Sequence, residues 1–555
     1  MKVYLAGFLL LFLSLPWWGG EYLRSLGLSV LLYAALGAAW ATFTGPARHL
    51  SLATSAFFGT GVYTVALLHE FAPWPVLVVL AFALAAFLAL GVGLATLRLQ
   101  GIYFTVFTYG LAELVRQLVT WAQRNLGGSV GSYVFVEASP LDLYYALALL
   151  AFLTLGLGHL FLQSRFGLAL LALGDDETAA RHAGVRVFGL RVVVFAATAG
   201  IMGAIGAVVA PRWVYVDPGL AFNPNLSFLT AITALLGGLR HPSGAFLAAP
   251  PLVLVYDLLS GPFPHHATAL LGLFFILLVY FLPRGLLGLF RERPPSSTLP
   301  QPGLEATPPP LPQVGPETGP LLEARGLRKA FGGLVAVAGL HLEVRPGETV
   351  GLIGPNGSGK TTALGLLAGT LRPDGGHISF LGQETTGKPP EFLAQRGLAR
   401  TFQQVRLFPS LTVYQHVYLP LSLRRVKGAE EATWGLLEAL GLREKAHHHP
   451  QALTYLDQKR LELARALALS PKLLLLDEWL AGLNPSELQE AIALLQALKG
   501  RGITLVVVEH LMPAVRALCD RVYVLSFGEV IAHGTPAEVL RHPKVVEVYL
   551  GVEHA

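Results

Sequence analysis

Ten near-continuous apolar stretches fill the first half of this 555-residue chain, and they restrict it to folds that a lipid bilayer can hold. Crossing the hydrocarbon takes about 20 helical residues, with about 17 as the usual lower limit. Most stretches reach that length, whereas 226–240 is short and is expected to be re-entrant or broken. The pattern predicts a polytopic α-helical membrane domain of about 8–10 spans. The stretches are residues 3–19, 25–45, 51–69, 75–97, 101–121, 143–162, 191–212, 226–240, 243–260 and 267–283.

The first stretch has an alternative interpretation as a secretory signal peptide, because Lys2 precedes an apolar run that ends at Trp18. No small-residue cleavage site follows Trp18, and further apolar stretches come at once, so a first transmembrane helix is predicted. With ten spans, positive charges favour one set of span ends, and such an excess marks the cytoplasmic side. Both termini are therefore predicted in the cytoplasm. The cytoplasmic ends hold Lys2, Arg48, Arg98, Arg165, Arg181, Arg186, Arg191, Arg240 and Arg284, against Arg24, Arg116, Arg124 and Arg212 outside.

The charged residues divide the chain into two parts. They make up about 8% of residues 1–290 but about 20% of the remainder, which approaches the soluble norm of about 25%. Residues 291–320 are rich in proline and lack apolar periodicity, so they are expected to be an extended tether. We predict a membrane domain over 1–290, a linker over 291–320 and a soluble domain over 321–555. The net charge of +5 comes with no basic patch, so nucleic acid is not an expected partner.

The longest charged loop on the cytoplasmic side runs from Ser164 to Arg191. Its centre combines the acidic residues Asp175, Asp176 and Glu177 with the basic segment that follows. Two interpretations stay open from the residues alone: a solvated loop, or a short helix that docks onto the soluble domain. Glycines inside the spans, such as Gly61 and Gly203, are expected where helices pack closely.

The strongest motif in the chain follows a strand-like run from Thr349 to Ile353 and precedes a helix-like run. A glycine-rich loop between a strand and a helix turns its backbone N–H groups toward phosphates, and the helix dipole adds to that attraction. Lys360 is predicted to reach the β and γ phosphates of a nucleotide, and Thr361 to ligate Mg²⁺. The nucleotide-binding residues are Gly354, Pro355, Asn356, Gly357, Ser358, Gly359, Lys360, Thr361 and Thr362.

Two further strand-like runs end in polar residues. The run of leucines from Leu473 ends at Asp477 and Glu478, where Asp477 suits the Mg²⁺ site and Glu478 can polarise an attacking water. A second run, Thr504 to Val508, ends at Glu509 and His510, and His510 is predicted to sense the γ phosphate.

These motifs together resemble the ATP-binding cassette (ABC) family over residues 321–555, which implies an α/β ATPase that uses ATP and Mg²⁺. By this resemblance Phe331 stacks on adenine, and Gln403 links Mg²⁺ and water to the transporter contact. His510 matches the histidine switch, and Ala481 to Asn484 the D-loop. Glu478 and His510 are the implied catalytic residues, and Thr361, Gln403 and Asp477 the metal ligands. The signature segment that contacts a partner's nucleotide is Thr454, Tyr455, Leu456, Asp457 and Gln458.

Residues 400–408, 534–538 and 549–551 are similar to the ATPase subunits of branched-chain amino-acid importers. Residues 51–63, 97–101 and 165–184 are similar to the permeases of the same systems. The resemblance implies an ATP-driven importer in the inner (plasma) membrane, with permease and ATPase fused. It also implies a coupling helix at 175–184, a second permease and ATPase as partners, an extracytoplasmic binding protein and contact with lipid. The substrate can be a branched-chain amino acid or another amino acid, an amide or urea, and its pocket is not identifiable.

Two residues depart from the family pattern. The family has glycine where Leu456 stands, and an added side chain obstructs close backbone approach to a phosphate. The family usually has proline where Trp479 follows the catalytic glutamate. Because a homodimer would place Leu456 in both sites, we predict a heteromeric assembly that hydrolyses ATP mainly at this chain's own site. The alternatives are an exporter half-transporter, which the short spans disfavour, and a non-transporting regulator switched by ATP. The run His447 to His449 is expected to be a solvated loop rather than a metal site.

Overall fold

The computed structural model describes residues 2–99, 101–127, 129–239, 241–262, 266–282, 285–289 and 319–550. The chain divides into two compact units. The membrane unit comprises Met1–Leu170 with Phe188–Ser296, and the cassette unit comprises Leu171–Val187 with Ser297–Ala555. The linker predicted at 291–320 lies outside the described residues except for Gly319 and Pro320. Outside them too are Gln100, Arg240, Arg284 and Gly551, which carried parts of the topology and family interpretations.

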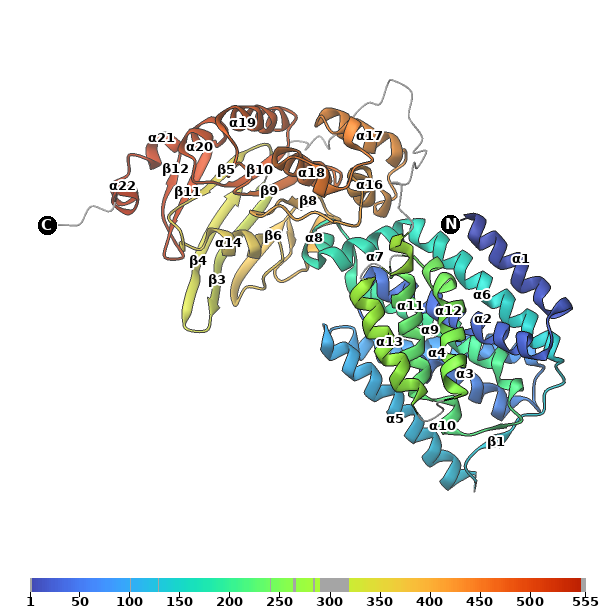
Figure 1. Ribbon diagram of the computed structural model, residues 1–555. Helices are drawn as coiled ribbons and strands as arrows, with labels where there is room; N and C mark the ends of the chain where they lie inside the picture. Colours follow the sequence, from blue (N-terminus) through green and yellow to red (C-terminus); the bar gives the residue numbers. More distant parts are fainter. Residues whose placement is uncertain are drawn as a thin grey trace. The chain divides into compact units, whose positions relative to one another are not determined.

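A helix lies on each of the ten predicted apolar stretches in the described part of the chain (Figure 1). The stretch 226–240, predicted to be re-entrant or broken, carries the unbroken helix α11. The interruption lies before that stretch, at Phe222 and Asn223, after the short helix α10 (Pro218–Ala221). A short antiparallel pair, β1 (Ser132–Tyr133) with β2 (Tyr215–Val216), completes this unit. The ten helices are α1 (Lys2–Trp18), α2 (Glu21–Ala47), α3 (Thr54–Leu68), α4 (Trp74–Thr96), α5 (Ile102–Leu126), α6 (Pro140–Gln163), α9 (Val187–Val209), α11 (Pro224–Gly237), α12 (Ser243–Ser260) and α13 (Ala267–Phe281).

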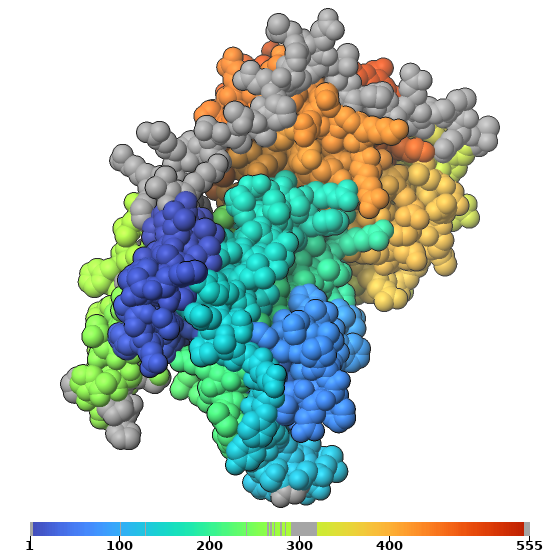
Figure 2. All heavy atoms as spheres, turned by 90° about the vertical axis from the view of Figure 1, so that its right-hand side faces the viewer, coloured from blue at the N-terminus to red at the C-terminus, as the bar shows by residue number. Residues whose placement is uncertain are grey.

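Six candidate spans in the described residues are long and apolar enough to cross a membrane, namely α2, α4, α6, α9 with the turn after it, α10 with α11, and α12. Two further apolar helices, over Tyr4–Trp18 and Thr54–Leu68, are shorter. The chain is thus a multi-pass membrane protein, and the number of crossings beyond these six stays a prediction. Figure 2 shows α1 in dark blue on the surface of the membrane unit, where Leu10 and Trp17 are exposed.

Glycines hold α3 against α9 at backbone distance. A Cβ built on Gly61 would lie 1.8 Å from the Gly203 carbonyl oxygen, and one on Gly206 would lie 2.1 Å from the Phe58 carbonyl oxygen. Neither position tolerates a side chain without moving a helix. The close packing expected of these small residues is confirmed.

The cassette unit contains two sheets in its described residues. The larger has the strand order β12–β11–β5–β10–β9–β8, in which all strands but β12 run parallel to their neighbours, and the smaller has the order β4–β3–β6–β7. Because β5, β10 and β9 are adjacent and parallel, their carboxyl ends meet at one edge of the larger sheet. The strands are β3 (Leu322–Phe331), β4 (Leu334–Val344), β5 (Thr349–Ile353), β6 (Gly375–Phe380), β7 (Gln383–Glu384), β8 (Leu398–Arg400), β9 (Leu473–Asp477), β10 (Thr504–Val508), β11 (Arg521–Ser526) and β12 (Glu529–Gly534).

The sequence explains the central strands and the helices that follow them. Every residue of β5, β9 and β10 is buried, as expected of parallel strands covered on both faces. Side-chain caps start four of these helices, from Thr412 into α16, Thr454 into α18, Asn484 into α19 and Thr535 into α21. The helices are α14 (Lys360–Leu367), α15 (Pro390–Ala394), α16 (Val413–Leu423), α17 (Ala429–Ala439), α18 (Tyr455–Leu467), α19 (Pro485–Gly500), α20 (Met512–Leu518), α21 (Pro536–Val539) and α22 (Pro543–Leu550).

Candidate nucleotide site and docking segment

The phosphate loop, residues 354–359, connects β5 to α14 at the edge where the parallel strands end. A Cβ on Gly354 would lie 2.1 Å from the Leu525 carbonyl oxygen, and one on Gly359 would lie 2.2 Å from the Ala336 carbonyl oxygen. Gly359 also has a φ of +98°. Only glycine fits at either position, so the loop keeps the bare backbone that phosphate binding needs. Its residues are Gly354, Pro355, Asn356, Gly357, Ser358 and Gly359, and Thr361 and Thr362 lie in the first turn of α14.

Lys360 folds back over this loop. Its Nζ donates hydrogen bonds of 2.8 Å to the carbonyl oxygens of Gly354 and Pro355, and the side chain is buried. Burial lowers the pKa of Lys360, and the carboxylates of Glu478 and Asp477 oppose that shift. The ammonium group is thus held inside the loop, near both strand-end carboxylates, where it can meet phosphate oxygens.

Several buried polar atoms of the site have no hydrogen-bond partner within the described residues. Among them are Ser358 Oγ in the loop and Asp477 Oδ1 at the end of β9. The other oxygen of Asp477, Oδ2, accepts a 2.8 Å hydrogen bond from Arg400 Nη2. Burial raises the pKa of Asp477, while the Arg400 guanidinium counteracts this rise. A buried polar atom without a partner costs free energy, so these atoms fit a site that accepts phosphate and a divalent cation.

The structure brings Glu478 and Gln403 together. Gln403 Nε2 donates a 2.8 Å hydrogen bond to Glu478 Oε2, although 75 residues separate them. Asp477 pairs in register with Val508, so His510 follows on the neighbouring strand end and is exposed. Phe331 lies at the end of β3 and is 48% exposed, as an aromatic platform for a base requires.

Glu509, which sequence reasoning left without a role, ties the two strand ends together. Its Oε1 accepts a 2.9 Å hydrogen bond from the Leu480 N–H, although Glu509 is almost fully buried. Burial raises the pKa of Glu509 to about 7. In the sequence, the position of Glu509 next to His510 at the end of a predicted strand was the feature that could have indicated this role.

The signature segment begins α18. Thr454 caps the helix, and Thr454 Oγ1 also donates to Asp457 Oδ2 at 2.8 Å. Burial tends to raise the pKa of Asp457, but hydrogen bonds from Lys445 and Thr454 outweigh it and lower the pKa. Tyr455 is 47% exposed, and Gln458 Nε2 donates to the Pro450 carbonyl oxygen at 3.2 Å. The exposed start of α18 can therefore face a second cassette.

Leu456 and Trp479, the two departures from the family pattern, line the same hollow of about 380 Å³ together with Leu440. The indole of Trp479 is buried, and its Nε1 donates to the Lys459 carbonyl oxygen at 3.3 Å. Lys459 Nζ in return donates to the Trp479 carbonyl oxygen at 2.7 Å. The loop after Glu478 is thus fastened to the signature helix, a role for Lys459 that no sequence signal indicated.

The docking segment, residues 171–187, belongs to the cassette unit and contains α8 (Glu177–His182). Asp175 accepts hydrogen bonds from the N–H and the hydroxyl of Ser410 at 2.7 and 3.0 Å. Asp176 caps α8 and accepts a hydrogen bond from Arg406 at 3.2 Å. Of the two interpretations open from the residues, docking is confirmed and a solvated loop is wrong.

His182, at the end of α8, connects the docking segment to the strand-end carboxylate of Asp477 through Thr370 and Arg400. Its Nε2 lies 2.9 Å from Thr370 Oγ1, and its ring packs edge-on against Phe402. The same Thr370 hydroxyl accepts a 3.2 Å hydrogen bond from Arg400 Nη1, and Arg400 binds Asp477. Burial lowers the pKa of His182 well below its ordinary value, and the surrounding arginines reinforce this effect.

Replacing Asp175 with Ala is expected to separate ATP hydrolysis from transport. The change removes both hydrogen bonds to Ser410, and each bond to a charged group is worth roughly 1.5–3 kcal/mol, so docking affinity is expected to fall at least about tenfold. Basal ATPase should persist, while transport per ATP hydrolysed falls about tenfold or more. Ser410→Ala keeps the backbone N–H bond and should have the smaller effect. Unchanged coupling in Asp175→Ala, with Glu444→Ala as a surface control, would contradict the docking role.

The fold and the site define an ABC-type ATPase joined to a multi-spanning permease. Three family descriptions match successive parts of the chain. "Branched-chain amino acid transport system / permease component" matches residues 22–282, "ABC transporter" matches 337–481, and "Branched-chain amino acid ATP-binding cassette transporter" matches 529–555.

The cassette is similar to known ATP-binding proteins. The high-affinity branched-chain amino acid transport ATP-binding protein LivG of Escherichia coli K12 is 41% identical, over 42% of this chain and 98% of its own length. BraF of Pseudomonas aeruginosa, a protein of the same description, is 39% identical over the same shares. The crystal structure of a nucleotide-free ATP-binding cassette from an ABC transporter is 30% identical, covering 42% of this chain and 100% of its own, at a TM-score of 0.39.

The chain belongs to the ABC transporters of the branched-chain amino-acid type, with the permease and the ATPase of that family in one polypeptide. It is an importer subunit that hydrolyses ATP, with a cytoplasmic ATPase, and it works in a complex with other ABC subunits and a substrate-binding protein. The exporter and regulator alternatives are not favoured.

Proposed function

We propose that the chain imports branched-chain amino acids across the inner (plasma) membrane, as one half of a complex with a second permease and ATPase. The observation that carries this proposal is the permease match over residues 22–282, because the cassette alone does not set the cargo. A lipopolysaccharide export ATPase, LptB of Acidithiobacillus ferridurans, is 36% identical to the same cassette. We further propose domain boundaries of 1–290 and 321–555, with 291–320 as the tether.

In this proposal different residues of the nucleotide site bind the phosphates, the adenine and the metal ion. Lys360 and the loop N–H groups hold the β and γ phosphates, and Phe331 supports the adenine. Thr361, Gln403 and Asp477 would hold Mg²⁺, which when bound neutralises charge on the phosphates. The buried Oδ1 of Asp477, without a hydrogen-bond partner in the described residues, supports a metal at that position.

The remaining residues act on the water and on the partner. Glu478 accepts a proton from the attacking water, and its bond to Gln403 orients the carboxylate. His510 senses the γ phosphate from the neighbouring strand end. Thr454, Tyr455, Leu456, Asp457 and Gln458 face the nucleotide on the partner cassette.

Leu456 supports a heteromeric assembly. A leucine in the signature adds a side chain beside backbone that approaches the partner's γ phosphate, and glycine is the residue that allows such approach. A partner with an intact signature leaves this chain's own site complete, so that site carries most of the hydrolysis.

Leucine uptake into proteoliposomes tests the cargo. The chain, its partner permease and ATPase, and the binding protein from neighbouring coding sequences are reconstituted with internal ATP. We expect ATPase stimulated by leucine-loaded binding protein, with accumulation of leucine, isoleucine and valine. Stimulation by urea or a short-chain amide, without leucine uptake, would overturn the proposed cargo and leave the importer assignment intact.

A further inference from the structure

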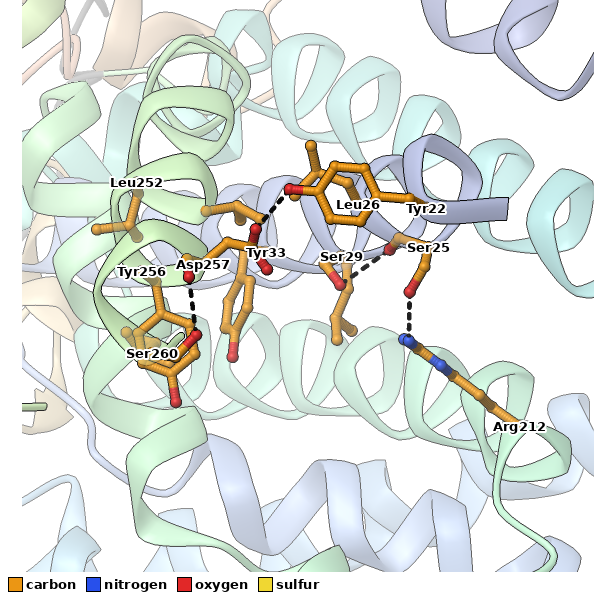
Figure 3. A pocket seen from close by; sticks show the side chains of 13 residues that line it. Tyr22, Ser25, Leu26, Ser29, Tyr33, Arg212, Leu252, Tyr256, Asp257 and Ser260 are labelled. Carbon is orange, nitrogen blue, oxygen red and sulfur yellow. Dashed lines mark hydrogen bonds between the residues drawn. The ribbon is translucent and has the colours of Figure 1, made fainter. Parts of the chain in front are cut away.

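The membrane unit contains a hollow of about 390 Å³ that the nucleotide chemistry does not use (Figure 3). Its wall comes from α2, α11, α12 and the turn η1 (Ala210–Arg212) that follows α9. This volume falls in the usual range for a small-molecule pocket. Its polar lining side chains include Tyr22, Ser25, Ser29, Tyr33, Arg212 and Asp257.

Two opposite charges face this hollow. Tyr22 Oη donates a 2.5 Å hydrogen bond to Asp257 Oδ2, and Arg212 Nη2 donates a 2.9 Å hydrogen bond to Ser25 Oγ (Figure 3). Tyr22 and Ser25 are three residues apart on α2, so they are neighbours on one helical face. Arg212 and Asp257 thus lie at the same end of α2, yet within the described residues they form no ion pair with each other.

The hollow also has an apolar side. Leu252 and Val253 on α12 and Leu229 on α11 are buried and line it. A ligand with one positive group, one negative group and an aliphatic portion would satisfy both kinds of wall. Arg212 and Asp257 line the hollow without forming an ion pair with each other within the described residues, so both charges are accessible to a ligand.

The topology places the hollow on the extracytoplasmic side. The docking segment is part of the cassette unit, so α9, which follows it, begins at the cytoplasmic side. With 23 residues, α9 extends about 35 Å, which exceeds the hydrocarbon thickness of about 30 Å. Arg212 follows α9 and therefore lies at the outer end, as the distribution of positive charges also predicts.

We propose that this hollow binds a free α-amino acid with an aliphatic side chain at the outer mouth of the permease. Arg212 receives the α-carboxylate, because guanidinium groups match carboxylates with paired N–H donors. Asp257, oriented by Tyr22, receives the α-ammonium group. Leu229, Leu252 and Val253 contact the side chain. The inference rests on the proposed function, because it takes the proposed cargo as the ligand and assigns each part of that ligand to one wall of the hollow.

Direct binding to the intact complex in nanodiscs, without the binding protein, tests the pocket. Radiolabelled leucine is the probe, competed by leucinamide, which lacks the carboxylate, and by 4-methylpentanoate, which lacks the ammonium group. We expect Arg212→Gln and Asp257→Asn each to weaken leucine binding roughly tenfold or more. Arg212→Gln should lose the preference for leucine over leucinamide, and Asp257→Asn the preference over 4-methylpentanoate. A folding defect would weaken all three ligands alike and would not change these preferences selectively.

Arg124→Gln and Glu137→Gln are matched controls, because both residues are exposed and neither lines the hollow. Basal ATPase should be unchanged in these two control variants. Leucine affinity and ligand preference like those of the unmodified complex in Arg212→Gln and Asp257→Asn would overturn the pocket assignment. Leucine uptake driven by the binding protein, measured with the same complex in proteoliposomes, shows separately whether the proposed function holds.

Discussion

Replacing Glu478 with Gln is expected to leave ATP binding intact and to reduce hydrolysis by the assembled complex about 100-fold or more. A general base contributes at least about 100-fold to such a reaction. Glutamine keeps the shape of the side chain and an oxygen that can still accept the 2.8 Å hydrogen bond from Gln403 Nε2. It cannot accept a proton from water. Steady-state ATPase and equilibrium binding of a fluorescent ATP analogue, both with Mg²⁺, measure the two effects separately.

The equivalent change in the partner cassette is the matched control, and it tests the role of Leu456. In the proposed heteromer the partner's nucleotide faces this chain's Leu456, so we expect that site to contribute little and its loss to reduce hydrolysis only slightly. Leu456→Gly should restore glycine at the signature and raise the residual activity of the Glu478→Gln complex. Equal losses from the two glutamine variants, or full activity of this chain alone as a homodimer, would defeat the heteromeric proposal.

Replacing Lys360 with Ala is expected to abolish transport and to weaken ATP binding by about 10- to 100-fold. The ammonium group is the point charge on the phosphates, and a hydrogen bond to a charged group is worth roughly 1.5–3 kcal/mol. We expect the cassette to fold in this variant. The removed ammonium group is a buried cation, and its two hydrogen bonds are to carbonyl oxygens of the adjacent loop only. The rise in Tm that ATP causes in the unmodified complex should therefore be lost, while the Tm without nucleotide changes little.

Lys499→Ala provides the matched control for this lysine. Lys499 forms a 2.7 Å ion pair with Asp520, and an ion pair at the surface is worth about 0–1 kcal/mol. That variant should keep the ATP-induced rise in Tm and full transport. ATP-dependent transport that persists in the Lys360→Ala complex would refute the assignment of the phosphate loop.

The phosphate loop and the strand-end carboxylates were predictable because each is a short motif of consecutive residues. Glycine at 354 and 359 indicates backbone positions where no other residue fits. The leucines before Asp477 indicate a strand that is buried on both faces. Once parallel strands are assumed, their carboxyl ends must meet. The membrane helices were predictable for a similar reason, because the length of an apolar stretch that spans the membrane follows from bilayer thickness.

The supporting contacts were not predictable, because they join residues that are distant in sequence. His182 and Thr370 are 188 residues apart, and Arg400 and Asp477 are 77 apart. Lys459 occupies a charged stretch of α18 that is typical of a solvent-facing helix, and only the tertiary structure buries it. The hollow of the membrane unit was missed for a related reason: its residues come from four elements that are distant in sequence.

The contacts of Asp175 and Asp176 have a consequence for a permease and an ATPase that share one polypeptide. Two separate subunits at low cellular concentration need tight binding to stay together. Partners joined by a short chain meet at an effective concentration on the order of millimolar. An interface with a Kd near 1 mM, or about 4 kcal/mol, is then half occupied at that concentration. The covalent connection therefore lets the docking segment bind weakly enough to release and rebind within one transport cycle, at a fixed ratio of one permease to one ATPase.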